Sequence, residues 1–333
     1  MKTNNDYILR KRMHGQYLSR KNDDITELSR ELLGLHCWFH RNVVFSALIR
    51  GADITGWKTA LTKTWLYRGT LHGVAFDDLR LLLALNSGES WMERCLGSER
   101  VEKISNEVLS LMEDGIYSRA EMRRLFAHSY DPQTIATVLS PWGGIFVHLA
   151  MMGKVAFRNM TSRDFDLISA EPIQTREDVI PELLRRYFKT YGPATLSDAA
   201  YFFGIWKEEK KKLKEMNFDE YEQFKHEGNT YYHYKDNEEP AEIPELTLLS
   251  GFDPFIVSYI ERGAVLPKEY KKAVILSSGI CLPTIAVNGR VVGLWNIKKG
   301  EPVTEFFESQ PARITNAASD MADEIRWQTA GRI

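Results

Sequence analysis

The sequence predicts an α+β fold with tandem winged-helix units, each a helix-turn-helix followed by a β-wing, and a β-rich region at the C-terminal end. Three observations support this fold class. Apolar residues recur at spacings of three and four in several segments, which is typical of amphipathic helices. Gly192-Pro193 interrupts such a pattern ahead of a short capped helix and a hairpin pattern. Asn288-Gly289 lies between two apolar runs and indicates a tight β-turn.

Residues 1–97 are predicted to form the first winged-helix unit. Helices are expected at 6–19, 26–35 and 39–50, and a strand is expected from Trp65 to His72. Alternation along that strand would place Arg68, Thr70 and His72 on one face, opposite Trp65, Tyr67 and Leu71. Asp77 or Asp78 is expected to cap the next helix.

Residues 98–170 are predicted to form the second winged-helix unit. Helices are expected at 101–112 and 134–150, and Ser118 with Glu121 forms a capping-box pattern for another helix between them. The segment 153–159 is expected to be the strand that follows the recognition helix.

Residues 171–240 are predicted to form the third winged-helix unit, and residues 241–333 the β-rich region. The third unit would contain a helix at 178–191, a short helix capped by Thr195 or Ser197 that ends near Gly204, a recognition helix at 206–216 and a hairpin at 222–234 that turns at Gly228-Asn229. In the β-rich region the hairpin 284–295 is the clearest element.

The composition restricts the classes of partner. The chain has 333 residues and a formal net charge of −2, so binding to nucleic acid has to come from local basic clusters. One such cluster lies near the N-terminus, where a solvated helix face and a phosphate contact are both open interpretations; its members are Lys2, Arg10, Lys11, Arg12, Arg20 and Lys21.

The cysteines predict a reducing environment. The three cysteines are far apart in the sequence, so neither a disulfide framework nor a structural zinc site is expected. Neither an apolar run of membrane-spanning length nor a signal peptide is apparent, and the expected location is the cytoplasm. No obligate protein partner is implied.

Several blocks of the sequence resemble the AlkZ/YcaQ-like family of winged-helix DNA glycosylases. The most specific block runs from Thr64 to His72 and continues into Asp77-Asp78-Leu79-Arg80. The others occur in the order of the family, at 32–35, 192–198, 249–255 and 288–295. The resemblance implies a fold of tandem winged helices and a monofunctional enzyme that excises alkylated purines from double-stranded DNA with an activated water, without a metal or an organic cofactor.

The family's catalytic motif is Gln-x-Gln or Gln-x-Asp, directly after the block that matches Leu32 to Leu35. This chain has His36, Cys37 and Trp38 there and so departs at both catalytic positions. A histidine can orient a water, whereas an indole cannot accept a hydrogen bond and would stack on a base or sugar instead. The alternative is that both side chains simply pack at a helix start.

The resemblance and the expected strand geometry together imply that Arg68, Thr70 and His72 contact the substrate. A structural ion pair of Arg68 or His72 with Asp77 or Asp78 is the alternative. His36 and His40 have a spacing suited to a metal, but a surface or capping role is preferred because a third ligand is not evident.

The remaining candidates lie toward the C-terminus. Five lysines between 207 and 214 could form a basic recognition helix, although surface ion pairing explains the pattern equally well. Asp253 is expected to be a turn or N-cap residue ahead of Pro254. Arg290, at a hairpin tip, is either a DNA contact or an ordinary exposed arginine.

The sequence therefore predicts a DNA N-glycosylase in which His36 and Trp38 act at the reaction centre and Arg10, Arg12, Arg68, Thr70, His72 and Arg290 bind DNA. The alternative is a non-catalytic winged-helix protein, DNA-binding or regulatory, that recognises DNA without excising a base.

Overall fold

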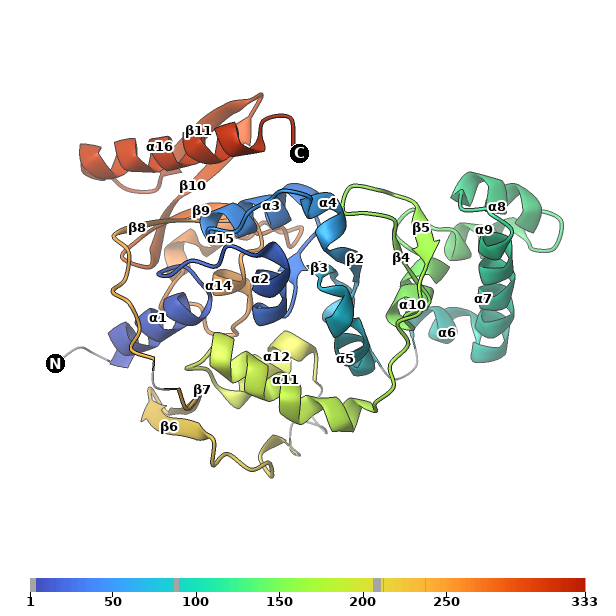
Figure 1. Cartoon of the computed structure of the whole chain (residues 1–333), viewed down its shortest axis with the longest axis horizontal. Helices are drawn as coiled ribbons and strands as arrows, with labels where there is room; N and C mark the ends of the chain where they lie inside the picture. Colours follow the sequence, from blue (N-terminus) through green and yellow to red (C-terminus); the bar gives the residue numbers. More distant parts are fainter. Residues whose placement is uncertain (1–3, 87–89, 206–210, 212, 237, 333) are drawn as a thin grey trace. The chain divides into compact units, whose positions relative to one another are not determined.

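The computed structural model describes residues 4–86, 90–205, 211, 213–236 and 238–332 (Figure 1). The chain folds into two compact units. The first, here called the N/C unit, comprises the residues up to Trp57 and from Pro181 onward, and the second, the middle unit, runs from Lys58 to Ile180. The division into four segments expected from the sequence stays a prediction, and the predicted recognition helix at 206–216 lies largely outside the described residues.

The N/C unit contains helices from both ends of the chain. They are α1 (Asn4–Gly15), α2 (Ile25–Glu31), α3 (His40–Ile49), α12 (Leu196–Phe203), α14 (Pro254–Val257), α15 (Lys271–Val274) and α16 (Ala312–Thr329). Helices α4 (Trp57–Ala60) and α11 (Arg176–Thr190) cross the borders between the units.

The strands of the N/C unit are β1 (Leu35–His36), β6 (Tyr221–His226), β7 (Asn229–Tyr234), β8 (Leu246–Leu249), β9 (Thr284–Val287), β10 (Arg290–Lys298) and β11 (Glu301–Phe306). The last four form an antiparallel sheet in the order β11-β10-β9-β8. The expected turn between β9 and β10 is confirmed, because Asn288 and Gly289 have φ values of 47° and 75°, the left-handed backbone that a two-residue turn needs.

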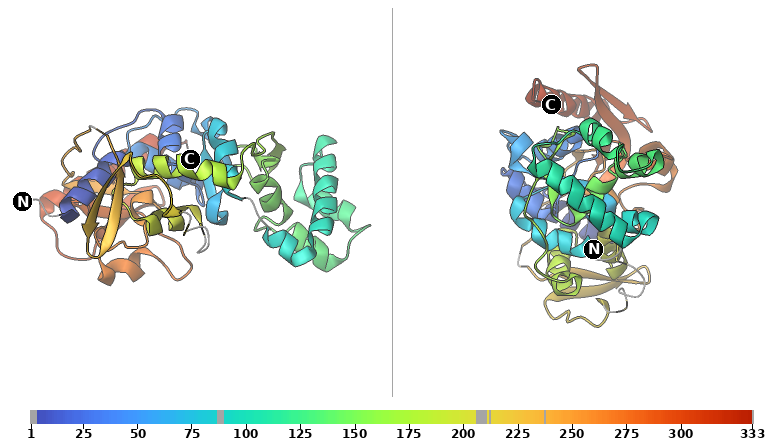
Figure 2. Two further views of the ribbon diagram at one scale, coloured as in Figure 1. Left: turned by 90° about the horizontal axis from the view of Figure 1, so that it is seen from below. Right: turned by 90° about the vertical axis from the view of Figure 1, so that its right-hand side faces the viewer.

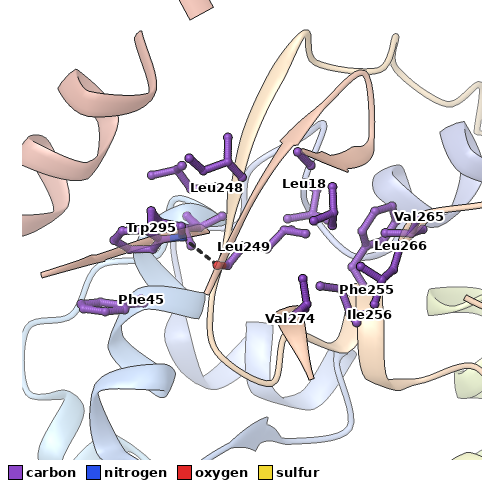
Figure 3. Packing of buried hydrophobic residues seen from close by; sticks show 14 of the residues in the cluster. Leu18, Phe45, Leu248, Leu249, Phe255, Ile256, Val265, Leu266, Val274 and Trp295 are labelled. Atoms are coloured by element: carbon purple, nitrogen blue, oxygen red, sulfur yellow. Dashed lines mark hydrogen bonds between the residues drawn. The ribbon is translucent and has the colours of Figure 1, made fainter. Parts of the chain in front are cut away.

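One hydrophobic core joins the N-terminal helices to this C-terminal sheet. Leu9 of α1, Phe45 of α3 and Trp295 of β10 belong to the same buried cluster. The Trp295 indole lies 5.0 Å from the Phe45 ring and donates a hydrogen bond of 2.9 Å to the Leu249 carbonyl (Figure 3). Helix α3, which follows the candidate catalytic segment, is therefore anchored by residues more than two hundred positions later in the sequence.

Helix α16 was not expected from the sequence. It lies along the sheet of strands β8 to β11 (Figures 1 and 2), and its Ala318, Ala322 and Ile325 are buried in the same core. The C-terminal region is thus a sheet covered by a helix, rather than a region dominated by strands.

The elements expected around Gly192-Pro193 are present. Thr195 is the N-cap of α12, and its side chain and that of Asp198 form a reciprocal capping box. Gly204 ends the helix in the left-handed conformation. The hairpin β6–β7 turns one residue earlier than expected, at Glu227 and Gly228.

The middle unit contains α5 (Leu79–Leu83), α6 (Trp91–Leu96), α7 (Ser98–Glu113), α8 (Arg119–Phe126), α9 (Pro132–Val138), α10 (Ile145–Met151), β2 (Thr62–Trp65), β3 (Leu71–Val74), β4 (Val155–Phe157) and β5 (Phe165–Leu167). Helices α7 to α10 precede the antiparallel pair β4–β5, and the two groups share a core that includes Trp65, Phe146 and Phe165. These helices are the teal and green ribbons of Figure 2.

At the starts of α8 and α5 in the middle unit, the helix caps expected from the sequence are not formed. Ser118 is at the N-cap of α8, but its side chain makes no capping hydrogen bond, so the expected capping box is wrong. Asp78 lies at the N-cap of α5 in helical backbone conformation and likewise makes no side-chain cap.

The prediction of a single helix at 134–150 is also wrong, because α9 ends at Val138 and α10 begins at Ile145. Between them Pro141 lacks an N–H, and Gly143 and Gly144 have φ values of 126° and 57°. A β-carbon on Gly144 would lie 2.0 Å from the Val138 carbonyl oxygen, so the start of α10 lies very close to the backbone at the end of α9.

Candidate active site

In the segment 35–38, which follows α2, successive side chains point in opposite directions. Leu33 and Gly34, with φ values of 56° and 105°, end the helix earlier than expected and lead into the extended residues of β1. Leu35 and Cys37 are each 1% exposed and pack inward, whereas His36 is half-buried and Trp38 is 45% exposed. Since neighbouring residues of an extended chain face opposite sides, His36 and Trp38 share the outward face.

The His36 imidazole is held in a defined orientation. Its ring stacks on the Phe252 ring with a centroid distance of 4.1 Å and an interplanar angle of 6°. The Trp38 backbone N–H donates to His36 Nδ1 at 3.4 Å. In the neutral ring this contact places the proton on Nε2, so Nε2 acts as a donor.

Phe252 itself occupies an unusual backbone conformation. Its φ of 55° lies in the left-handed region, which costs a bulky residue about 1–2 kcal/mol. The following residue, Asp253, caps α14 as expected by accepting the Phe255 N–H. Asp253 also makes a contact that the sequence did not predict, because its carboxylate binds the Arg50 guanidinium through two hydrogen bonds of 2.8 and 3.0 Å.

The Arg50–Asp253 ion pair is fully buried, with both side chains 0% exposed. The Arg50 guanidinium also donates to the Gln16 carbonyl and to Ser46, and the Asp253 carboxylate also accepts from Ser250. The pair thereby ties the end of α3 to the turn that carries Phe252.

Two exposed aromatic side chains follow shortly after His36 in the chain. Trp38 and Phe39 are 45% and 39% exposed. The exposed His40 imidazole stacks on the Trp57 indole at 6.2 Å, and His36 stacks on Phe252 instead. Each of the two histidines therefore has its own aromatic partner, and within the residues described here no cluster of three or more His, Cys, Asp or Glu is arranged to hold a metal.

The strand expected from Trp65 to His72 is instead a hairpin of the middle unit. Strands β2 and β3 pair antiparallel, and the chain turns through Arg68 and Gly69, with φ values of 59° and 64°. Because the turn ends the alternation, Arg68 is not on a strand face but at the exposed tip. Gly69 allows this turn without steric strain.

The other two predicted residues of this block form contacts within the hairpin. The Thr70 hydroxyl donates to the Tyr67 carbonyl at 3.1 Å, and His72 Nδ1 donates to the Thr70 carbonyl at 3.0 Å. His72 is only 4% exposed and its ring lies 4.8 Å from that of Tyr67, on which it was not expected to pack. Burial raises the pKa of the Tyr67 phenol well above its ordinary value, so its hydroxyl stays protonated at neutral pH.

Two arginines of the N-terminal basic cluster, Arg10 and Arg12, contact the protein itself. Arg12 is 3% exposed, and its guanidinium lies 3.7 Å from the centre of the Tyr259 ring and donates to the Pro193 carbonyl. Arg10 donates to the Pro240 carbonyl and pairs with Glu242. These contacts give both arginines structural roles, and the burial of Arg12 leaves no surface for the phosphate contact that was expected.

Arg290 is exposed, at the start of β10. The turn before it does not project freely, because Gly289 approaches Leu9 of α1 so closely that a β-carbon there would lie 2.7 Å from the leucine side chain. The hairpin tip is therefore fixed on α1, with the Arg290 side chain at its edge.

The predicted site residues belong to both units. His36 and Trp38 lie together in the N/C unit, and Arg68, Thr70 and His72 lie together in the hairpin of the middle unit. The sequence did not single out Phe252, although the residue lies in the matching block 249–255, because no local signal indicates which distant ring an aromatic side chain will contact.

Comparison with known proteins identifies the family. A family model described as DNA glycosylase AlkZ-like matches residues 58–325. The interstrand DNA cross-link repair glycosylase of Streptomyces sahachiroi is 26% identical over 305 residues, covering 82% of this chain and 81% of the relative. The solved structure of Streptomyces sahachiroi DNA glycosylase AlkZ has a TM-score of 0.77 at 23% identity and covers 98% of both chains, which shows a common fold.

The residues matched by the family model do not include His36 or Trp38, so their role is taken up as a proposal below. No helix within the described residues is long and apolar enough to cross a membrane. Since the match covers well over half of the sequence, this chain belongs to the AlkZ-like DNA glycosylase family.

Proposed function

We propose that the protein is a monofunctional DNA N-glycosylase that removes alkylated purines from double-stranded DNA with water as the nucleophile. The observation that carries this proposal is the paired display of His36 and Trp38 on the outward face of an extended segment. A side chain and its neighbour two positions on share that face, which is the arrangement that a Gln-x-Gln motif requires.

The reaction needs little acid or base assistance. A purine alkylated at N7 or N3 carries a positive charge, and the electrons of the N-glycosidic bond neutralise it as the base departs. The water oxygen then bonds to C1′, and a proton from that water passes to solvent. The protein has to place the water and stabilise the sugar cation.

His36 and Trp38 suit this chemistry in different ways. The Nε2–H of His36 donates to the water oxygen and so orients its other lone pair toward C1′. The Trp38 indole offers an exposed face for stacking on a base or sugar. No lysine stands out as a Schiff-base nucleophile, so the proposal does not include strand cleavage.

The first test is release of N7-methylguanine from a duplex by wild-type protein and by His36→Ala. We expect the variant to release the base about 10- to 100-fold more slowly, because it loses a donor at the reaction centre. Duplex affinity, measured by fluorescence anisotropy, should be unchanged. A cross-linked duplex is a second substrate to assay, since the Streptomyces relative is named for repair of interstrand cross-links.

The matched control is His36→Gln, which restores the glutamine that stands at this position in the family motif. It should retain more release than His36→Ala. Equal release by wild type and both variants would contradict the assigned role of His36.

One observation favours a second function, which is DNA binding without catalysis. Trp38 cannot accept a hydrogen bond, so the second polar group of the family motif is missing. Tight duplex binding by wild type with no base release, together with release by the His36→Gln/Trp38→Gln double variant, would support this alternative.

DNA contact is proposed for Arg68 at the hairpin tip of the middle unit. Its exposed position suits a phosphate contact, and the helices α7 to α10 followed by β4–β5 have the element order of a winged helix. Arg68→Ala should weaken duplex binding several-fold and reduce the slope of log affinity against log salt by about 1.

Arg313→Ala provides the matched control. Arg313 lies on helix α16 and its side chain is 66% exposed, so the substitution removes the same charge from another part of the surface. It should leave the salt slope unchanged. Identical slopes for wild type and Arg68→Ala would exclude a phosphate contact by Arg68.

A further inference from the structure

We propose that Phe252 is a positioning residue that sets the plane of the His36 imidazole and that the Arg50–Asp253 pair holds Phe252 in place. The catalytic part of this inference rests on the proposed function, whereas the structural part does not.

The stack and the backbone contact restrain different motions of His36. Near-parallel rings with centroids 4.1 Å apart resist rotation of the imidazole out of that plane. A half-turn of the imidazole would keep the stack but exchange Nδ1 with a carbon. The Trp38 N–H, which donates to Nδ1, opposes that half-turn. Together the two contacts select one orientation and one neutral tautomer.

The backbone at Phe252 is better suited to glycine or asparagine. A φ of 55° is uncommon for a bulky aromatic residue and persists only where the surroundings impose it. Here the Phe252 N–H donates to the Cys281 carbonyl at 3.1 Å, and Asp253 is fixed by Arg50. The combination of a strained backbone with a ring directed at a candidate catalytic histidine indicates that the ring is functional.

Helix α3 connects the two partners. It begins at His40, directly after the His36 segment, and Arg50 follows its last residue. Near its start, the buried Asn42 side chain lies so close to Gly251 that a β-carbon there would be 2.9 Å from the amide oxygen. Both ends of α3 therefore contact the turn at 250–253, and this fixes the turn relative to His36.

The experiment compares Phe252→Leu, Phe252→Asn and Phe252→Tyr. Imidazole nitrogen and carbon-bound proton shifts of His36 are measured by NMR, without substrate, with His36→Gln used for assignment. Leucine keeps apolar volume but has no ring, asparagine fits the left-handed backbone, and tyrosine keeps the ring. Phe224→Leu is the matched control, because Phe224 stacks on Tyr231 at 5.7 Å far from His36 in the sequence.

We expect Phe252→Leu and Phe252→Asn to lose the ring-current shift of His36 and to move its nitrogen shifts toward a mixture of tautomers. Their kcat for base release should fall about tenfold with a smaller change in KM, and Phe252→Tyr should resemble wild type in both readouts. Unchanged His36 shifts in the leucine and asparagine variants would overturn the proposal. So would a tyrosine variant that behaves like leucine.

The NMR readout separates this inference from the proposed function. If wild-type protein releases no base, the proposed function fails, but the His36 shifts still show whether Phe252 orients the ring. If wild type is active and the shifts respond while kcat does not, the positioning role in catalysis is contradicted.

Discussion

Asp253→Ala is expected to lower the free energy of unfolding by about 3–5 kcal/mol, because it leaves the Arg50 guanidinium buried without its counter-ion. Both side chains are 0% exposed, so water cannot replace the lost carboxylate. The variant also removes the cap of α14 and the acceptor for Ser250. Urea denaturation followed by circular dichroism measures the change.

An exposed ion pair serves as the control for Asp253→Ala. Asp323 pairs with Arg326 on α16, with side chains 40% and 26% exposed. Asp323→Ala should lower the free energy of unfolding far less than Asp253→Ala does, since exposed pairs contribute little. Similar costs for the two variants would show that the buried pair does not stabilise the turn. Replacing both Arg50 and Asp253 by apolar residues should cost less than removing Asp253 alone.

Gly144→Ala should destabilise the middle unit by about 3 kcal/mol or more, because two effects combine. The backbone, with φ 57° and ψ −132°, is strained for any residue with a β-carbon. That β-carbon would also lie 2.0 Å from the Val138 carbonyl oxygen, and a backbone atom cannot swing aside as a flexible side chain can. Hydrogen exchange of the amides in α9 and α10 reports the loss locally.

Gly115→Ala separates these two effects. Gly115 follows α7 with a φ of 85°, and a β-carbon there would meet nothing within 4 Å. This variant should therefore show backbone strain alone, about 1 kcal/mol. If Gly144→Ala costs no more than Gly115→Ala, the close approach between α9 and α10 is not rigid.

Much of the local structure follows from neighbouring residues. Thr195 with Asp198 and the final Gly204 delimit α12 as expected, and Asn288-Gly289 makes the expected turn. Each signal acts over four residues or fewer, through a hydrogen bond or a permitted φ, so it needs no knowledge of the rest of the fold. The prediction of one helix at 134–150 was wrong because it relied on the periodic apolar pattern and gave too little weight to Pro141, Gly143 and Gly144, which interrupt a helix.

Charge patterns were poorer guides than turn signals. Arg10 and Arg12 form part of a basic cluster in the sequence, yet their partners lie at Pro240, Glu242, Pro193 and Tyr259. An arginine at a surface and one that stacks on a buried tyrosine look alike in a list of residues. Only the chain path decides which carbonyls and rings are near enough to replace water.

The sequence by itself determined the family resemblance, the mixed α and β class, the caps of α12 and α14 and the turn at Asn288-Gly289, whereas the common outward face of His36 and Trp38 on an extended segment came from the structure. Tertiary structure alone decided that Phe252 stacks on His36, that Asp253 neutralises Arg50, and that Arg68 stands at a turn while His72 is buried. The physical reason is the range of the forces involved. Caps and turns act between neighbours, whereas stacking and buried ion pairs depend on which distant segments the hydrophobic core brings together.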